Sequence, residues 1–157
     1  MLPFGLLSKL KERDAFSYIT SLSQEVSQGL DYAQEARNAD EQGWGDTLLF
    51  GWPQPWGFAI IRTISSRDGP SQPICEVISA VIEPKARNQL GEVMQLLQSY
   101  ADEKRASQID LSVNAIDSAT LQEVIANGFR VSRVMIRMIY KGEFIRPAGI
   151  DMSRWAM

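Results

Sequence analysis

The run ICEVISAVI, residues 74–82, is the part of this sequence that most restricts the fold. It is apolar at nearly every position, which is typical of a strand buried on both faces. A helical pattern follows, with apolar residues at Leu90, Val93, Leu97, Tyr100 and Ala101. Because a strand buried on both faces needs helices on both sides of its sheet, we expect an α/β (α+β) fold.

Two kinds of element are predicted before this strand. Apolar residues recur in steps of three and four from Asp14 to about Asp40, which indicates one amphipathic helix, or two with a break at Gly29, ending near Gly43. The runs TLLFGW and GFAIIRTIS flank a proline-rich turn, so residues 47–65 are predicted to form a hairpin.

Three further elements are predicted after the helix. Residues 109–115 alternate as a strand, Asp117 or Ser118 can cap a short helix that stops at Asn127-Gly128, and residues 129–140 favour a final long strand. The order predicts a mixed central sheet with helices on both faces. We expect a single domain over residues 1–157, with an N-terminal helical region (1–42), a core of sheet and helices (43–141) and a C-terminal tail (142–157).

Composition removes several classes of function. The chain of 157 residues has a net charge of -3, so nucleic acid is not expected as a partner. It has no histidine, which removes the usual triads and the usual zinc and iron sites, and we predict no metal site. It has a single cysteine and no run of membrane-spanning length, so we expect no contact with membranes and a cytoplasmic location.

The turn VIEPKARNQLGE, residues 81–92, joins the buried strand to the helix. Free N–H groups at the helix start, together with Lys85 and Arg87, would favour an anion there. Glu83 and Glu92 oppose those two cations, however, and a plain connection capped by Asn88 is the alternative.

The ordered set of motifs resembles the GCN5-related N-acetyltransferases (GNAT). It comprises LLFGWPQPWGFAIIRT, then CEVISAVIEPKAR, a helix, a strand, a short helix ending in NGFR, and MIRMIYKG, over roughly residues 43–141. The resemblance implies the acyl-CoA N-acyltransferase fold, acetyl-CoA as co-substrate, and transfer of an acetyl group to an amine on a small molecule or peptide.

The resemblance also implies where the coenzyme would bind. In this family the strand before the turn presents backbone groups to the pantetheine arm, and the turn binds the pyrophosphate. Pro84 and Arg87 match the motif, whereas Leu90 and Glu92 stand where glycines are usual. The implied coenzyme-binding residues are Val81, Ile82, Arg87, Asn88, Gln89, Leu90, Gly91 and Glu92.

Catalytic roles carry over less completely. Glu76 matches a glutamate that takes a proton from the acceptor amine, and a carboxylate in an apolar strand suits a general base. The alternative is a solvated or salt-bridged carboxylate. Val124 stands where the family often has a tyrosine that acts as the acid, which leaves Tyr100 and Tyr140 as the remaining candidates, each more typical of packing.

The N-terminal segment does not have the pattern of the strand that normally opens such a domain. We therefore expect either a divergent member that takes its missing strand from elsewhere or the second, C-terminal half of a tandem GNAT protein, with a homodimer partner or a companion GNAT domain supplying that strand. Two alternatives to an enzyme stay open. One is a degenerate GNAT-like domain for packing, dimerisation or coenzyme sensing, and the other is a binding module under the tryptophans Trp44, Trp52 and Trp56.

Overall fold

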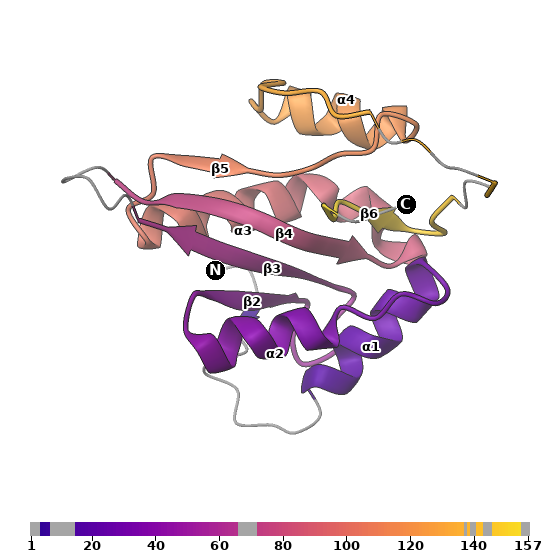
Figure 1. Ribbon diagram of the computed structural model, residues 1–157, viewed down its shortest axis with the longest axis horizontal. Helices are drawn as coiled ribbons and strands as arrows, with labels where there is room; N and C mark the ends of the chain where they lie inside the picture. Colours follow the sequence, from indigo (N-terminus) through magenta and orange to yellow (C-terminus); the bar gives the residue numbers. More distant parts are fainter. Residues whose placement is uncertain are drawn as a thin grey trace.

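A mixed sheet forms the centre of the molecule in the computed structural model, which describes residues 4–6, 15–65, 72–136, 138, 141–142 and 146–154 (Figure 1). Its strands are β1 (Phe4–Leu6), β2 (Gly45–Phe50), β3 (Gly57–Ile64), β4 (Ile74–Ile82), β5 (Gln108–Asp110) and β6 (Ile150–Asp151). The strands β1 to β5 lie in chain order, and β6 pairs with β4. Neighbours are antiparallel except β4 and β5, which are parallel, so the predicted mixed sheet is confirmed.

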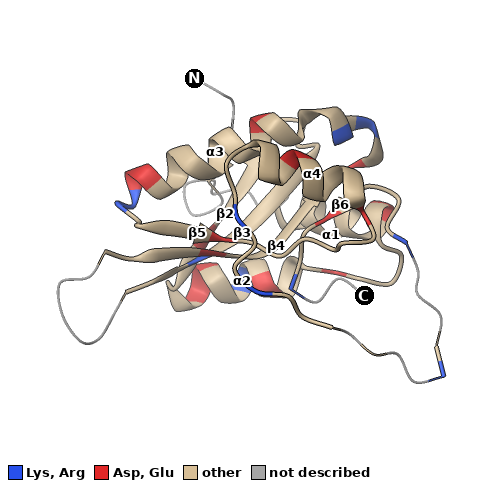
Figure 2. Cartoon of the chain, turned by 90° about the horizontal axis from the view of Figure 1, so that it is seen from above, with Lys and Arg blue, Asp and Glu red and all other residues tan. Residues whose placement is uncertain are grey.

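Helices cover both faces of this sheet, as predicted. They are α1 (Ala15–Val26), α2 (Ala33–Gln42), α3 (Leu90–Glu103), α4 (Ser118–Ala126) and the 3-10 helix η2 (Pro84–Gln89). Figure 2 shows α3 and α4 above the sheet and α2 below it. The helices α1 and α2 pack on β2, β3 and β4, while α4 packs on α3.

Alternation along the strands separates two hydrophobic cores. Phe50 lies in the core between the sheet and α3, whereas its neighbour Leu49 lies in the core between the sheet and the α1–α2 pair. Successive side chains of a strand point to opposite faces, so one strand serves both cores. The near-continuous apolar character of residues 74–82 has this cause: β4 contacts both helical layers.

A β-bulge changes the alternation in the middle of β4. Ile60 of β3 pairs with Ser79 and Ile61 pairs with Val77, so Ile78 is an extra residue in β4. A bulge re-aims the side chains beyond it. As a result Val77 and Ala80 both lie in the α3 core, and Val81 lies in the other core.

Several local predictions are confirmed. The hairpin, the strand over residues 74–82 and the break between two N-terminal helices all form. Gly43 ends α2 with φ 63°, a left-handed conformation that glycine adopts without strain. Asp117 caps α4, accepting a hydrogen bond from the backbone N–H of Thr120 at 3.2 Å.

Three predictions at element ends are wrong. An opening strand does exist: β1 pairs with β2, although three residues with a central glycine give almost no strand signal. Asn88 does not cap α3, because it belongs to η2 and α3 begins at Leu90. The strand predicted over 109–115 is only β5, because the chain after Asp110 leaves β4 and the ladder ends.

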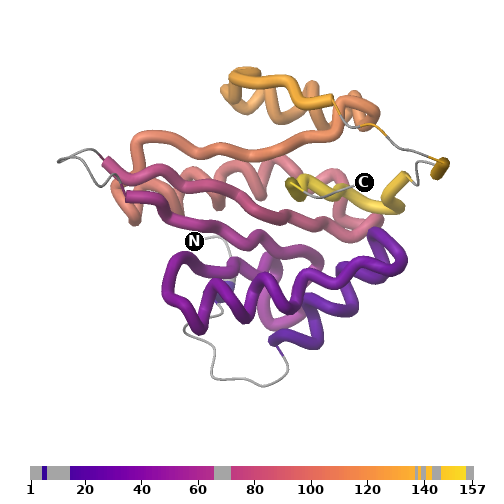
Figure 3. The backbone as a smooth tube through the Cα atoms, viewed as in Figure 1, coloured from indigo at the N-terminus to yellow at the C-terminus, as the bar shows by residue number. Residues whose placement is uncertain are grey.

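The long final strand predicted over residues 129–140 is also wrong for its described part. Residues 129–136 and 138 form no strand, and Val131, Val134 and Ile136 are 61%, 80% and 88% exposed. Figure 3 shows this part of the chain leading away from α4 outside the sheet. A strand-like sequence forms a strand only where it pairs, and among the described residues it is β6 that pairs with the end of β4.

Candidate coenzyme site along β4

One edge of β4 has two different neighbours. Its first half pairs with β5 up to Glu76, which lies opposite Asp110, and its last two residues pair with β6. We call residues 78–82 the distal half of β4 and residues 146–154 the tail. Figure 1 shows the chain after β5 diverging from β4, with β6 beside the end of β4.

The tail pairs with the distal half of β4 through its backbone. The N–H of Met152 donates to the carbonyl of Ala80 at 2.8 Å, and the N–H of Arg154 donates to the carbonyl of Ile78 at 3.0 Å. Val81 and Ile82, two predicted coenzyme-binding residues, are paired with Asp151 and Ile150. The edge predicted to receive a pantetheine arm therefore holds an extended peptide of the same chain.

Glu76, the predicted general base, lies between two arginines. Its carboxylate receives a hydrogen bond from Nε of Arg62, its cross-strand neighbour on β3, at 2.9 Å. The other carboxylate oxygen is 2.8 Å from Nη1 of Arg154 in the tail, and the Glu76 side chain is 13% exposed. The salt-bridged alternative describes this arrangement, and the catalytic role of Glu76 stays a prediction.

Arg87 in η2 contacts the tail on one side and α4 on the other. Its Nη1 donates to the carbonyl of Gly149 at 2.7 Å, and its Nη2 donates to the carboxylate of Asp117 at 2.9 Å. Burial raises the pKa of Asp117, but hydrogen bonds from Thr120 and from Arg87 outweigh it and lower that pKa overall. The predicted phosphate ligand thus binds a carboxylate and a carbonyl oxygen, both of which a phosphate could replace.

The other predicted turn residues lie at the join of η2 and α3. Asn88 is exposed at the end of η2, and the Leu90 side chain is fully buried in the α3 core. Gly91 and Glu92 occupy the first turn of α3, and the Glu92 carboxylate faces the positive end of that helix. This carboxylate weakens the preference of the helix start for an added anion.

A buried polar group under the tail was missed by sequence reasoning. Asp151 of β6, 7% exposed, accepts hydrogen bonds from the Tyr32 hydroxyl at 3.1 Å and the Ser27 hydroxyl at 3.3 Å. Burial raises the pKa of Asp151 despite those hydrogen bonds, and burial and Asp151 raise the pKa of Tyr32. No local pattern marks this contact, because it joins residues more than a hundred positions apart.

The predicted candidates for a general acid lie in packed positions or outside the described residues. Tyr100 is 1% exposed, and burial together with the nearby Asp46 raises its pKa to about 12. Val124 is buried in the α3 core. Tyr140 lies outside the described residues.

The tryptophans pack at the hairpin and away from the tail. The rings of Phe50 and Trp56 lie 5.6 Å apart, and those of Tyr18 and Trp52 lie 6.1 Å apart. Trp44 lines a hollow of about 320 Å³ with Thr63, Tyr100 and other residues. These ring contacts are typical of tryptophans that pack over the end of a hydrophobic core.

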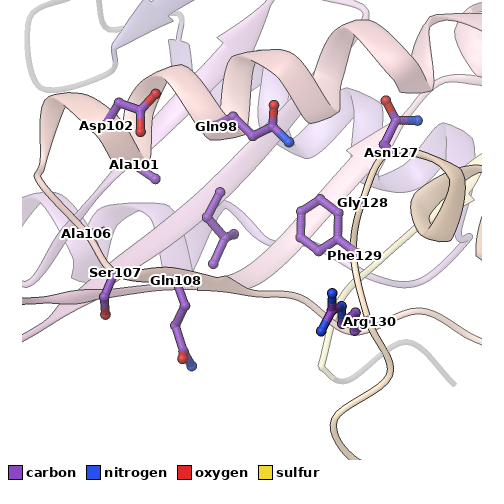
Figure 4. Close-up of a pocket in the computed structure, with 11 residues that line it drawn as sticks. Gln98, Ala101, Asp102, Ala106, Ser107, Gln108, Asn127, Gly128, Phe129 and Arg130 are labelled. Atoms are coloured by element: carbon purple, nitrogen blue, oxygen red, sulfur yellow. The ribbon is translucent and has the colours of Figure 1, made fainter.

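A second hollow, of about 340 Å³, lies between α3, β5 and the residues after α4. Figure 4 shows Phe129 pointing into it from the segment after α4 and Gln98 and Asp102 bordering it from α3. No residue predicted for the coenzyme site lines it. It is therefore separate from the site along β4.

The described part of the chain contains no metal cluster and no membrane-spanning helix. Nothing among those residues brings three or more acidic, cysteine or histidine side chains together as a metal site would. None of the helices described has the length and apolar character needed to cross a bilayer.

Comparisons with known proteins place the fold. No family model and no curated protein matches the sequence. The aminoglycoside N-acetyltransferase AAC(6')-Iy in complex with CoA matches with a TM-score of 0.66 and 10% identity, over 90% of this chain and 96% of that chain. A Trypanosoma brucei acetyltransferase matches with a TM-score of 0.67 and 15% identity, over 89% and 100%.

An aminoglycoside acetyltransferase from an uncultured soil metagenomic sample, solved in complex with sisomicin, has a TM-score of 0.68 at 9% identity over 90% of this chain and 97% of that chain. The chain has the GNAT acyl-CoA N-acyltransferase fold, and the resemblance drawn from the sequence is confirmed at the level of the fold.

Proposed function

We propose that this chain is an acyl-CoA-dependent N-acyltransferase of the GNAT type, which transfers an acetyl group from acetyl-CoA to an amine on a small molecule or peptide. The observation that carries the proposal is the departure of β5 from β4 after Glu76, which leaves the edge of the distal half to an extended partner. A pantetheine arm is such a partner, since its amides can hydrogen-bond to a strand edge as a peptide does.

The residues along this edge fit the coenzyme in part. The carbonyls of Ile78 and Ala80 accept hydrogen bonds from an extended chain, and Arg87 offers a guanidinium suited to the pyrophosphate. Leu90 does not obstruct, because its side chain points into the core. Glu92 opposes phosphate binding, so Arg87 carries most of the attraction for the anion.

The transfer reaction requires few catalytic groups from the site. The amine nitrogen attacks the thioester carbonyl, a C–N bond forms, the C–S bond breaks, and coenzyme A leaves as a thiolate or thiol. Glu76 would accept the amine proton directly or through water, which requires Arg154 to move from its carboxylate. A thiolate is a tolerable leaving group near neutral pH, so a dedicated acid is not required.

For the acceptor we propose only a chemical class, a cationic amine. Two of the matching structures are aminoglycoside acetyltransferases, and one of them is in complex with sisomicin. The carboxylate of Glu35 on α2, which accepts a hydrogen bond from Ser79 of β4, lies on the side of the sheet that faces α1 and α2. A carboxylate on this side suits a cationic amine acceptor.

Calorimetric titration with acetyl-CoA and with acetyl-pantetheine tests the proposal. We expect acetyl-CoA to bind at least about tenfold more tightly, because a charge-assisted hydrogen bond to phosphate contributes roughly 1.5–3 kcal/mol. Arg87→Ala should reduce this ratio, whereas Lys85→Ala, which removes an exposed cation of the same 3-10 helix, should change it less. Taking the ratio cancels any effect of Arg87 on the tail, because the tail affects both ligands alike.

A turnover assay completes this test. Glu76→Gln should lower turnover with a panel of amines without weakening acetyl-CoA binding. Binding of neither ligand at millimolar concentration would overturn the proposal, and unchanged turnover in Glu76→Gln would overturn the role of Glu76.

A catalytically degenerate domain is the second candidate, and one observation favours it. The stretch after α4 exposes Val131, Val134, Met135, Ile136 and Met138. An extended apolar segment of this kind is suited to pairing with another chain. Light scattering separates the candidates: a dimer without coenzyme affinity supports this one, and a monomer that binds acetyl-CoA supports the enzyme.

A further inference from the structure

The tail is seated in the place of an extended ligand. Its two backbone hydrogen bonds to β4, from Met152 to Ala80 and from Arg154 to Ile78, continue the antiparallel register of β6. These carbonyls belong to the strand edge proposed to receive the pantetheine arm. The two occupants therefore need the same hydrogen-bonding groups.

Apolar anchors hold the tail on this edge. Ile150 is 2% exposed and Met152 is 1% exposed, and both belong to the α3 core. A Cβ on Gly149 would overlap the carbonyl oxygen of Ile82 and lie 3.1 Å from the backbone nitrogen of Pro84. The backbone approaches so closely here that only glycine fits.

The tail also engages the two charged residues of the proposed site. Arg154 binds the Glu76 carboxylate at 2.8 Å, and the carbonyl of Gly149 accepts a hydrogen bond from Arg87 at 2.7 Å. The proposed base, the proposed phosphate ligand and the strand edge are thus all contacted by residues 149–154 of the tail.

The described residues that lead to the tail are exposed, so they do not hold the tail in place. Residues 131–136, which precede it in the chain, are all exposed. The seated tail also carries a penalty of its own, because burial of Asp151 disfavours its charged form. The tail is held by a few buried apolar side chains, is destabilised by a buried carboxylate and follows exposed residues. Such a segment is suited to moving as a unit.

We propose that residues 148–154 are an intramolecular competitor of the acyl-CoA: the seated tail closes the coenzyme site, and coenzyme binds when the tail leaves β4. This inference rests on the proposed function, because it assigns the regulation of the same site. Apparent affinity is then the intrinsic affinity reduced by the fraction of molecules whose tail is released.

Gly149→Ala in the full chain tests this inference, with Arg146→Ala as the matched control. The alanine at 149 cannot be accommodated against Ile82, so the tail should leave β4, whereas Arg146 is exposed and its replacement should leave the tail seated. We expect acetyl-CoA to bind at least about tenfold more tightly to Gly149→Ala than to the wild type, and equally to Arg146→Ala and the wild type.

Amide hydrogen exchange provides a readout that needs no coenzyme. The N–H groups of Met152 and Arg154 should exchange slowly in the wild type and Arg146→Ala, and rapidly in Gly149→Ala or in the wild type saturated with CoA. Rapid exchange in the free wild type would overturn the inference. Equal acetyl-CoA affinity in all three proteins would also overturn it while leaving the proposed function intact.

Failure of the proposed function has a different signature. In that case the tail amides are protected in the wild type and released in Gly149→Ala, yet neither protein binds acetyl-CoA. This result would overturn both competition and enzyme, and it would identify the tail as a structural strand. A Gly149→Ala protein that has lost its circular dichroism signal would be replaced by Ile150→Ser, for which the same outcomes hold.

Discussion

The two halves of β4 differ in how their shared edge is covered. The first half is covered by β5, which follows α3 in the chain and pairs in parallel, as a crossover through a helix requires. The distal half is covered by the tail, which comes more than sixty residues after β4 in the chain and pairs with it antiparallel. The first pairing follows from the βαβ connection, whereas the second depends on a tail that can leave while the sheet remains.

The largest expected difference between the structure around α3 and the tail is in how much a buried side chain contributes to the free energy of unfolding. Leu97→Ala and Ile150→Ala each remove a buried side chain from the same core. We expect Leu97→Ala to cost about 2–5 kcal/mol of the free energy of unfolding. Ile150→Ala should cost less, because release of the tail limits the penalty to the free energy of its docking. Urea denaturation measures both, and an equal loss would mean that the tail is as integral to the fold as α3.

The pH dependence of stability also distinguishes the two halves of β4, because only the distal half pairs with a strand that carries a buried carboxylate, that of Asp151. The pKa of Asp151 is raised in the folded chain, so this group contributes stability at pH values below its unfolded pKa of about 3.9, and the contribution is lost as pH rises through the folded pKa. Relative to Asp151→Asn, the wild type should therefore lose stability as pH rises from about 4 to 7.

The expected loss of wild-type stability relative to Asp151→Asn is about 1.4 kcal/mol for each unit by which the pKa of Asp151 is raised. Thermal denaturation at several pH values checks it, with the difference between the two proteins taken at each pH so that other carboxylates cancel. A difference that does not vary with pH would contradict the burial of a charged Asp151 under the tail.

The smallest effect concerns the two partners of Glu76. Arg62 and Arg154 have side chains 41% and 37% exposed, and exposed ion pairs contribute about 0–1 kcal/mol each. Arg154→Gln should speed amide exchange of the tail alone, while Arg62→Gln should leave the tail amides unchanged. The reverse pattern in exchange measurements would show that Arg154 does not hold the tail.

Sequence reasoning succeeded where structure is local. The limits of β4, the hairpin, the break between α1 and α2 and the Asp117 cap all follow from periodicity and from residues a few positions apart. Glu76 and Arg87 were predicted from motif positions, and the structure places both in contact with the tail, Glu76 through Arg154 and Arg87 through the carbonyl of Gly149. Their functional roles stay predictions.

Sequence reasoning failed where the pairing partner of a strand had to be predicted. Residues 129–136 have the composition of a strand but pair with no described strand, while the tail, with no period of its own, pairs with β4. The contacts from Asp151 to Tyr32 and from Arg87 to Gly149 span 119 and 62 positions. Such pairings depend on the whole sheet, so no window of sequence contains them.

The most direct test of the account compares the backbone next to β4 with and without coenzyme by NMR. In the free chain we expect nuclear Overhauser effects between the paired residues Val81 and Asp151, and between Ile82 and Ile150. With saturating CoA these signals should disappear and be replaced by contacts between the pantetheine arm and the distal half of β4. Signals that persist in the CoA-saturated chain, or that are absent from the free chain, would contradict the claim that tail and coenzyme share one edge.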